Sequence, residues 1–155
     1  MFERQRLFGA ILNTPYVLIG LLVLIITSSV SNAEPTVLTG TVTHVRDGDT
    51  IEVGKVPIRL NGVSAPELKE PLGQRSKKFM RQLVEGERVR CELDGTKTYD
   101  RYVGVCFRDG KDIGIAVIAA GLALDCPRYS KGHYAVYETK DGLRTIKLPK
   151  YCRAK

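Results

Sequence analysis

Hydrophobic and polar positions alternate along residues 36–63, in runs separated by short turns. Residues 36–46 carry β-branched side chains in alternation, which predicts a strand. The tripeptide DGD at residues 47–49 then turns the chain. Residues 50–53 and 56–63 predict two more strands, and Gly54 with Lys55 suits the tight hairpin between them. We therefore expect three consecutive strands here.

A helical period replaces this alternation after Pro71. Over residues 73–84, the apolar side chains of Phe79, Met80, Leu83 and Val84 fall on one face of a helix. Gly86, just beyond this run, is a suitable residue to end it. One amphipathic helix is expected here.

The next two strand-like runs cover residues 88–94 and 102–110. Asp112 can cap a second helix over residues 113–120, and Gly121 can close it. Beyond Cys126 the pattern weakens, although a short third helix over residues 134–139 is possible and the last residues are expected to be extended.

This element order is three strands, a helix, two strands, a helix and an irregular end. It matches a five-stranded Greek-key barrel of the OB type, in which a helix lies between the third and fourth strands. The expected fold class is α+β, mainly β, with two to three helices.

The first 33 residues have the features of a targeting segment. Two arginines precede an apolar run of 12 residues, from Tyr16 to Thr27, and small residues follow up to Ala33. This run is shorter than the roughly 20 residues of a membrane-spanning helix, so we expect a secretory signal cleaved after Ala33. An uncleaved N-terminal membrane anchor is the alternative. In both cases residues 34–155 form one exported domain, periplasmic or extracellular.

Charge and cysteine content add two constraints. The 155 residues carry a net charge of +7, and +6 remains without residues 1–33, which hold two basic residues and one acidic residue. A basic domain favours polyanionic partners such as nucleic acid. All four cysteines lie in the exported part, where disulfides persist. Two disulfides are expected, with three possible connectivities, whereas the two histidines make a zinc site improbable.

Acidic and basic residues cluster between residues 47 and 67 in a way that a sheet alone does not require. Asp47 and Asp49 flank the DGD turn, which in an arbitrary sequence is often only a solvated turn. Arg59 lies between two apolar strand positions, so its side chain points away from the core that they fill. Glu67 follows Pro66, whose fixed φ stiffens the loop. Hydrolysis of a phosphodiester needs a base, cationic groups and often a divalent metal.

With these residues in place, the chain resembles the staphylococcal nuclease (thermonuclease) family. The resemblance rests on DGDT at residues 47–50, on IRL followed by G-V-x-A-P-E at residues 58–67, and on YDRY before a strand at residues 99–102. It extends over residues 38–129. It implies an OB barrel that cleaves DNA and RNA with calcium and with little sequence specificity.

The resemblance also implies roles for individual residues. Asp49 matches the metal-binding aspartate, Asp47 the neighbouring carboxylate behind it, and Ala65 the residue whose backbone carbonyl binds the metal. Glu67 matches the general base and Arg59 a phosphate-binding arginine. The aromatic positions near the nucleotide correspond to Tyr129 and, beside the same groove, Tyr102. The expected partner is single-stranded or frayed nucleic acid, bound by a monomer with no stable membrane contact after cleavage.

Two positions depart from the family pattern. Ser64 stands where the family has a second metal-binding aspartate, which should weaken calcium binding. The segment after Tyr102 is about three residues shorter than the family's. When the alignment is anchored on the following strand, Arg101 takes the place of the second catalytic arginine. When it is anchored on DRY, Arg101 falls on a less critical basic position. An exposed turn arginine with no role is the other alternative. We favour the first alignment because core strands tolerate changes of length less than turns do.

The resemblance gives positions to the cysteines and leaves a second function open. Cys91 and Cys106 fall on adjacent strands of the implied barrel and can form a cross-strand bridge, which leaves Cys126 and Cys152 to pair and tie down the C-terminus. The main expectation is an exported metal-assisted endonuclease. The alternative, favoured by Ser64, is a catalytically decayed domain that binds nucleic acid or protein.

Overall fold

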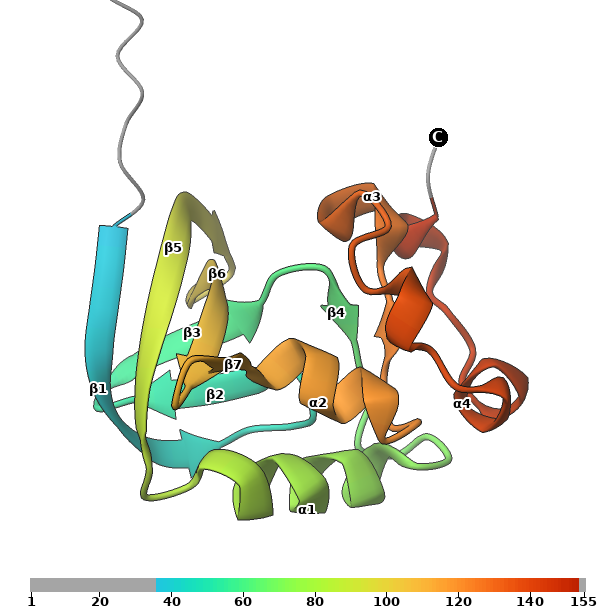
Figure 1. Ribbon diagram of the computed structural model, residues 1–155, viewed down its shortest axis with the longest axis horizontal. Coiled ribbons are helices and arrows are strands. Elements are labelled where there is room, and N and C mark those ends of the chain that lie inside the picture. Colours follow the sequence, from blue (N-terminus) through green and yellow to red (C-terminus); the bar gives the residue numbers. More distant parts are fainter. Residues whose placement is uncertain (1–35, 154–155) are drawn as a thin grey trace, which may run out of the picture. The chain divides into compact units, whose positions relative to one another are not determined.

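A closed barrel of five strands forms the centre of the structure, a computed structural model that describes residues 36–153 (Figure 1). The strands follow the order β3-β2-β1-β5-β6, and a parallel pairing of β3 with β6 closes the barrel. This confirms the expected OB-type fold and α+β class. The barrel strands are β1 (Thr36–Val45), β2 (Thr50–Val53), β3 (Val56–Leu60), β5 (Arg88–Thr98) and β6 (Arg101–Arg108).

Residues 36–153 form four α-helices, where two to three were expected. They are α1 (Gly73–Val84), α2 (Ile113–Ala119), α3 (Pro127–Ser130) and α4 (Lys140–Thr145). Figure 1 shows α1 and α2 against the barrel and the short α3 and α4 in the C-terminal region. The remaining elements are β4 (Val63–Ser64), β7 (Lys111–Asp112), β8 (Leu124–Asp125) and two 3-10 helices, η1 (Ala135–Tyr137) and η2 (Lys150–Cys152).

The hydrophobic pattern explains the long elements directly. On α1, Met80 and Val84 are fully buried, and Phe79 and Leu83 pack against the same core from its margin. Asp112 caps α2 through hydrogen bonds from the backbone N–H groups of Gly114 and Ile115. Both helices therefore begin and end within a residue of their expected positions.

The C-terminal region differs from the sequence expectation. A short helix was expected at residues 134–139, but η1 covers only three residues of that range. α3 and α4, with four and six residues, were not expected. Helices this short contain fewer than two turns and leave no apolar period to recognise. The expected extended tail also contains a 3-10 turn, η2.

Both disulfides join the cysteine pairs that the sequence analysis favoured. Cys91 and Cys106 are directly opposite each other on β5 and β6, inside the barrel. The bond between Cys126 and Cys152 closes a loop with a sequence separation of 26 residues. Closing a loop of that size stabilises the fold by about 3 kcal/mol in the chain-entropy model.

Residues 1–33, with the expected signal, lie outside the described residues. Among residues 36–153, no helix combines the length and the apolar character needed to cross a membrane.

Candidate active site

The DGD turn between β1 and β2 is held by hydrogen bonds at its base. The backbone N–H of Arg46 donates to the carbonyl of Thr50 at 2.9 Å, and the N–H of Asp49 donates to the Asp47 carboxylate at 3.0 Å. Asp49 is only 6% exposed. The turn therefore holds two carboxylates in fixed positions at one end of the barrel.

Gly48 lets this turn touch two other parts of the site. A Cβ atom at this position would lie 1.8 Å from the Ser76 hydroxyl oxygen on α1 and 2.7 Å from the Cβ of Ala65. Only glycine permits so close an approach. The turn, α1 and the loop that follows β4 are thus packed directly together.

Arg59 reaches the turn from β3. Its backbone is paired with Thr50 on β2, and its guanidinium forms an ion pair with the Asp49 carboxylate. Burial lowers the pKa of Arg59, while the Tyr151 hydroxyl and the Asp47 carboxylate act in the opposite direction. An arginine remains charged under these conditions, so the buried end of the site holds a permanent cation beside two carboxylates.

Glu67 lies on the loop between β4 and α1. The backbone N–H of Ala65 donates to Asp49 at 2.8 Å, and the N–H of Glu67 donates to the Glu70 carboxylate at 2.9 Å. At Gly73, a Cβ atom would lie 2.0 Å from the Glu67 carbonyl oxygen, so the start of α1 lies directly under the loop. Glu67 itself is exposed. Among the described residues, no hydrogen-bond partner engages its carboxylate.

Arg101, the first residue of β6, reaches the same end of the barrel. Its guanidinium donates to the Thr50 hydroxyl at 3.2 Å. Thr50 directly follows Asp49, so the side chain lies beside the DGD turn. The side chain is half-buried and belongs to the lining of the site.

These side chains surround a polar cavity of about 90 Å³, which we call the acidic–arginine cavity. It combines three carboxylates with two guanidinium groups, a formal charge of −1. Every expected catalytic and metal-binding residue borders it. The lining residues are Asp47, Asp49, Arg59, Ala65, Pro66, Glu67, Arg101 and Tyr151.

A larger groove of about 730 Å³ shares four of those residues with the cavity. Three exposed tyrosines line it, and each comes from a different element: Tyr99 from the β5–β6 hairpin, Tyr129 from α3 and Tyr151 from η2. Tyr99 is 94% exposed and has a φ of 58°. A two-residue hairpin requires a positive φ at its first residue, so the turn itself explains this conformation.

Of the two expected substrate-binding tyrosines, the structure brings only Tyr129 to the groove. Tyr102 packs against the core from β6, and the Lys97 ammonium lies 4.2 Å above its ring centre. Sequence reasoning missed Tyr99 and Tyr151. For Tyr99 the available signal was its position next to Asp100 in a two-residue hairpin; for Tyr151 it was its position next to a paired cysteine.

Ser64 lies on β4, where it is paired with Leu124 on β8 and is only 1% exposed. It does not line the acidic–arginine cavity. Among residues 36–153, no three histidine, cysteine, aspartate or glutamate side chains converge as a ready-made metal site. Calcium takes six to eight oxygen ligands, so any bound cation would rely largely on water.

The remaining donors nevertheless suit a hard divalent cation. Asp47 and Asp49 both line the cavity, and each oxygen of Asp49 already has at least one partner among Thr50, Arg59 and Ala65. Burial raises the pKa of Asp47, despite the opposing effect of the nearby Arg59 guanidinium. A cation placed there would relieve the cost of burying that charge. The site therefore fits a weakly held metal.

Replacing Asp47 with asparagine tests this charge balance. Because the pKa of Asp47 is raised on folding, the folded protein binds more protons than the unfolded chain, and stability falls as pH rises through the folded pKa. In the presence of a chelator, Asp47→Asn is expected to melt at a higher temperature than the wild type at pH 7. This gain should disappear below about pH 4, the ordinary range for aspartate. Thermal melts between pH 3 and 8 measure the gain at pH 7 and its loss at low pH. A lower melting temperature for Asp47→Asn than for the wild type at pH 7 would contradict the prediction.

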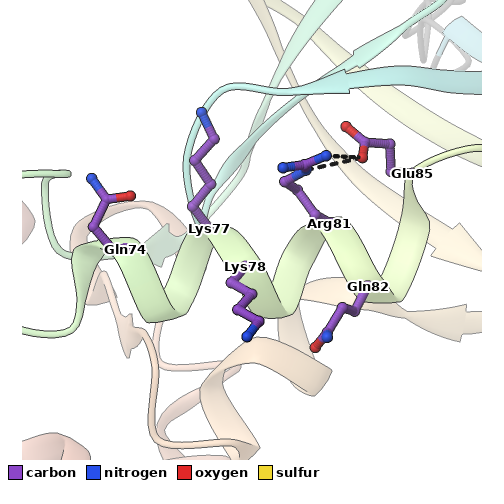
Figure 2. A pocket seen from close by; sticks show the side chains of 6 residues that line it. All are labelled: Gln74, Lys77, Lys78, Arg81, Gln82 and Glu85. Carbon is purple, nitrogen blue, oxygen red and sulfur yellow. Dashed lines mark hydrogen bonds and ion pairs between the residues drawn. The ribbon is translucent and has the colours of Figure 1, made fainter.

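A third pocket, of about 690 Å³, lies along the outer face of α1 and is lined only by residues of that helix and its C-cap. Figure 2 shows Lys77 and Lys78 leaving the helix on opposite sides. Arg81 forms an ion pair with Glu85 rather than facing the pocket freely. Because the side chains do not converge on one point, we assign no ligand to this surface.

Comparisons with known proteins agree with this geometry. Residues 57–142 match the family model described as "Staphylococcal nuclease homologue". The chain is 37% identical over 124 residues to the succinoglycan biosynthesis protein ExoI of Rhizobium meliloti. The aligned segment covers 72% of this chain and 63% of that protein.

Further relatives carry the name "Uncharacterized endonuclease". The one from Haemophilus influenzae is 30% identical over 101 residues, or 62% of this chain and 56% of that protein. The one from Escherichia coli O157:H7 is 35% identical over 96 residues, or 59% of this chain and 63% of that protein. The chain thus spans less than two thirds of each of these relatives.

Proposed function

Because this chain belongs to the staphylococcal nuclease family, we propose that it is an exported, metal-assisted endonuclease that hydrolyses phosphodiester bonds of DNA and RNA with little sequence specificity. One observation carries this proposal. Asp49, Arg59 and Glu67, from three separate segments, border a single polar cavity of about 90 Å³. That cavity opens beside a groove lined by tyrosines.

The charges around the cavity suit a phosphodiester only when a cation is present. The lining side chains alone carry a formal charge of −1, which repels a phosphate group of the same sign. A divalent cation held by Asp49, the Ala65 carbonyl and water, with Asp47 behind them, would reverse that sign and polarise the phosphate. These residues are its proposed ligands.

Glu67 is the proposed general base. Its exposed carboxylate can accept a proton from a water molecule as that water attacks phosphorus. The hydrogen bond from its backbone to Glu70 and the contact with Gly73 hold the loop in place. Arg59 and Arg101 then donate hydrogen bonds to the phosphate oxygens, where negative charge grows in the transition state.

The groove supports a preference for unpaired strands. Stacking of a base on an aromatic side chain contributes about 1 to 3 kcal/mol and tolerates any sequence. Tyr99 and Tyr129 offer such surfaces, and bases can reach them only when they are not paired. Export is supported by the two disulfides, which persist in an oxidising compartment.

A direct assay tests the proposed function. The purified protein is incubated with denatured DNA and with RNA, in millimolar calcium or in chelator, and products are separated by size. We expect internal cleavage of both polymers with calcium and little without it. Intact substrate under all conditions, with a folded protein, would overturn the proposal.

Ser64→Asp is expected to restore a metal ligand. Because residue 64 is 1% exposed, an added carboxylate without a cation should destabilise the protein by about 3 kcal/mol. Calcium should reverse this loss, and the calcium concentration for half-maximal cleavage should fall by about tenfold. Melting curves and calcium titrations of cleavage measure the two effects. Ser64→Asn, which adds the same bulk without the charge, is the control, and an equal response of both variants would show that residue 64 is not next to the cation.

Binding without cleavage is the second candidate function, and Ser64 is the observation that favours it. A site with too few ligands for calcium could retain affinity for nucleic acid through Arg59, Arg101 and the tyrosines. The same assay separates the two functions when it is combined with a binding measurement. Calcium-independent binding with no products would favour this alternative.

A further inference from the structure

Tyr151 borders both the acidic–arginine cavity and the larger groove, although it lies nine residues beyond the segment that matches the family model. It is half exposed. Among the hydrogen bonds of the described residues, none involves its hydroxyl. Arg59 also lines the cavity and the groove, so Tyr151 and Arg59 lie together where the two meet. Tyr151 therefore offers an unpaired hydroxyl on the wall of the same cavity that Arg59 lines.

The tail that carries Tyr151 has few other attachments. From residue 147 to residue 153, the hydrogen bonds found in the described structure stay inside the tail, from Cys152 to Pro149 and from Arg153 to Lys150. Cys152 is fully buried and bonded to Cys126. Apart from the packing of η2 against α3, this disulfide therefore links the tail to the rest of the described structure.

Cys126 is itself fixed next to the loop between β4 and α1, which carries Glu67 and is called the catalytic loop below. It directly follows β8, which pairs with β4, and its N–H donates to the Gly62 carbonyl at 2.8 Å. β4 leads directly into Ala65 and Glu67. The disulfide thus ties the tail to the same short ladder that supports the catalytic loop.

We propose that Tyr151 is a substrate-binding residue, that its hydroxyl donates a hydrogen bond to the phosphate held by Arg59, and that the Cys126–Cys152 disulfide positions it. This inference rests on the proposed function of the same site. It adds a substrate contact from outside the matched family segment. It also makes substrate affinity depend on an oxidised tail.

Equilibrium binding tests the proposal without interference from cleavage. A fluorescent single-stranded oligonucleotide is titrated in calcium with the Glu67→Gln protein as the parent, and anisotropy gives the dissociation constant. Tyr151→Phe, which keeps the ring, is expected to weaken binding by about tenfold, the usual effect of losing a hydrogen bond to a charged group. Tyr137→Phe, on η1 and outside both pockets, should leave affinity unchanged.

The disulfide is tested by non-additivity. Cys126→Ser/Cys152→Ser should weaken binding as much as Tyr151→Ala does, and the triple variant should be no weaker than either, because residues that act through one contact do not add. Cys91 and Cys106 remain paired in all these proteins, and melting curves confirm that each is folded at the assay temperature.

Three results would overturn the inference. Unchanged affinity in Tyr151→Phe and Tyr151→Ala would remove the contact, and additive losses would separate it from the disulfide. Tighter binding by Tyr151→Ala would show that the tail covers the site instead of serving it. If the Glu67→Gln parent still binds the oligonucleotide, these results reject the Tyr151 contact and leave the proposed function intact. If the folded parent binds no oligonucleotide, the Tyr151 contact and the proposed function are both rejected.

Discussion

Glu67→Gln is expected to lower the rate of cleavage by about 10²- to 10⁴-fold, the usual contribution of a general base. Glutamine keeps the size and the polar character of the side chain but cannot accept a proton from water. Because Glu67 is exposed and its carboxylate is not used in the fold, the melting temperature should change little. Substrate binding should be retained, so the loss should appear in kcat and not in KM.

Glu85→Gln is the matched control for this experiment. Glu85 follows α1 and pairs with Arg81, away from the acidic–arginine cavity. The same chemical change there should leave cleavage at the wild-type rate. If Glu67→Gln cleaves as fast as Glu85→Gln, Glu67 is not the base, and another group must activate the water.

The long elements of the fold could be predicted because their side-chain patterns are local. β2 and α1 begin and end at the expected residues. The four residues of β2 follow an alternating pattern and the twelve residues of α1 follow a helical period, and each pattern specifies one buried face. The positions of Asp49, Arg59 and Glu67 around one cavity also followed from the motif, because each lies next to an element whose direction the pattern defines. Their chemical roles stay predictions.

The positions that sequence reasoning missed depend on contacts between distant segments. Tyr102 was expected at the groove together with Arg101, but neighbouring residues of a strand point to opposite faces. Arg101 faces the cavity, so Tyr102 packs on the core, and Tyr99 in the hairpin reaches the groove. Tyr151 is brought to the site by a disulfide across 26 residues, and no local pattern encodes that distance.

Arg59 is expected to be the residue on which both the fold and the chemistry depend. Its guanidinium pairs with the buried Asp49 carboxylate and borders the cavity. Arg59→Ala leaves that carboxylate without its partner, so we expect a loss of stability of about 3 to 5 kcal/mol. Arg59→Lys keeps a charge and should remain folded, but an ammonium cannot donate to two phosphate oxygens from one plane. Cleavage by Arg59→Lys should therefore fall by about 10²- to 10³-fold.

Arg101→Lys separates the contribution of Arg59 to stability from its contribution to phosphate binding, because Arg101 contacts the Thr50 hydroxyl and no buried carboxylate. It should lower cleavage to a similar degree, and even Arg101→Ala should melt near the wild-type temperature. Denaturant melts of all four variants, combined with cleavage rates at saturating calcium, measure both quantities. Full activity in Arg59→Lys would mean that charge alone is sufficient at this position and that the planar guanidinium is not needed for phosphate binding. Equal stability of Arg59→Ala and Arg101→Ala would instead show that the ion pair with Asp49 contributes nothing to the fold.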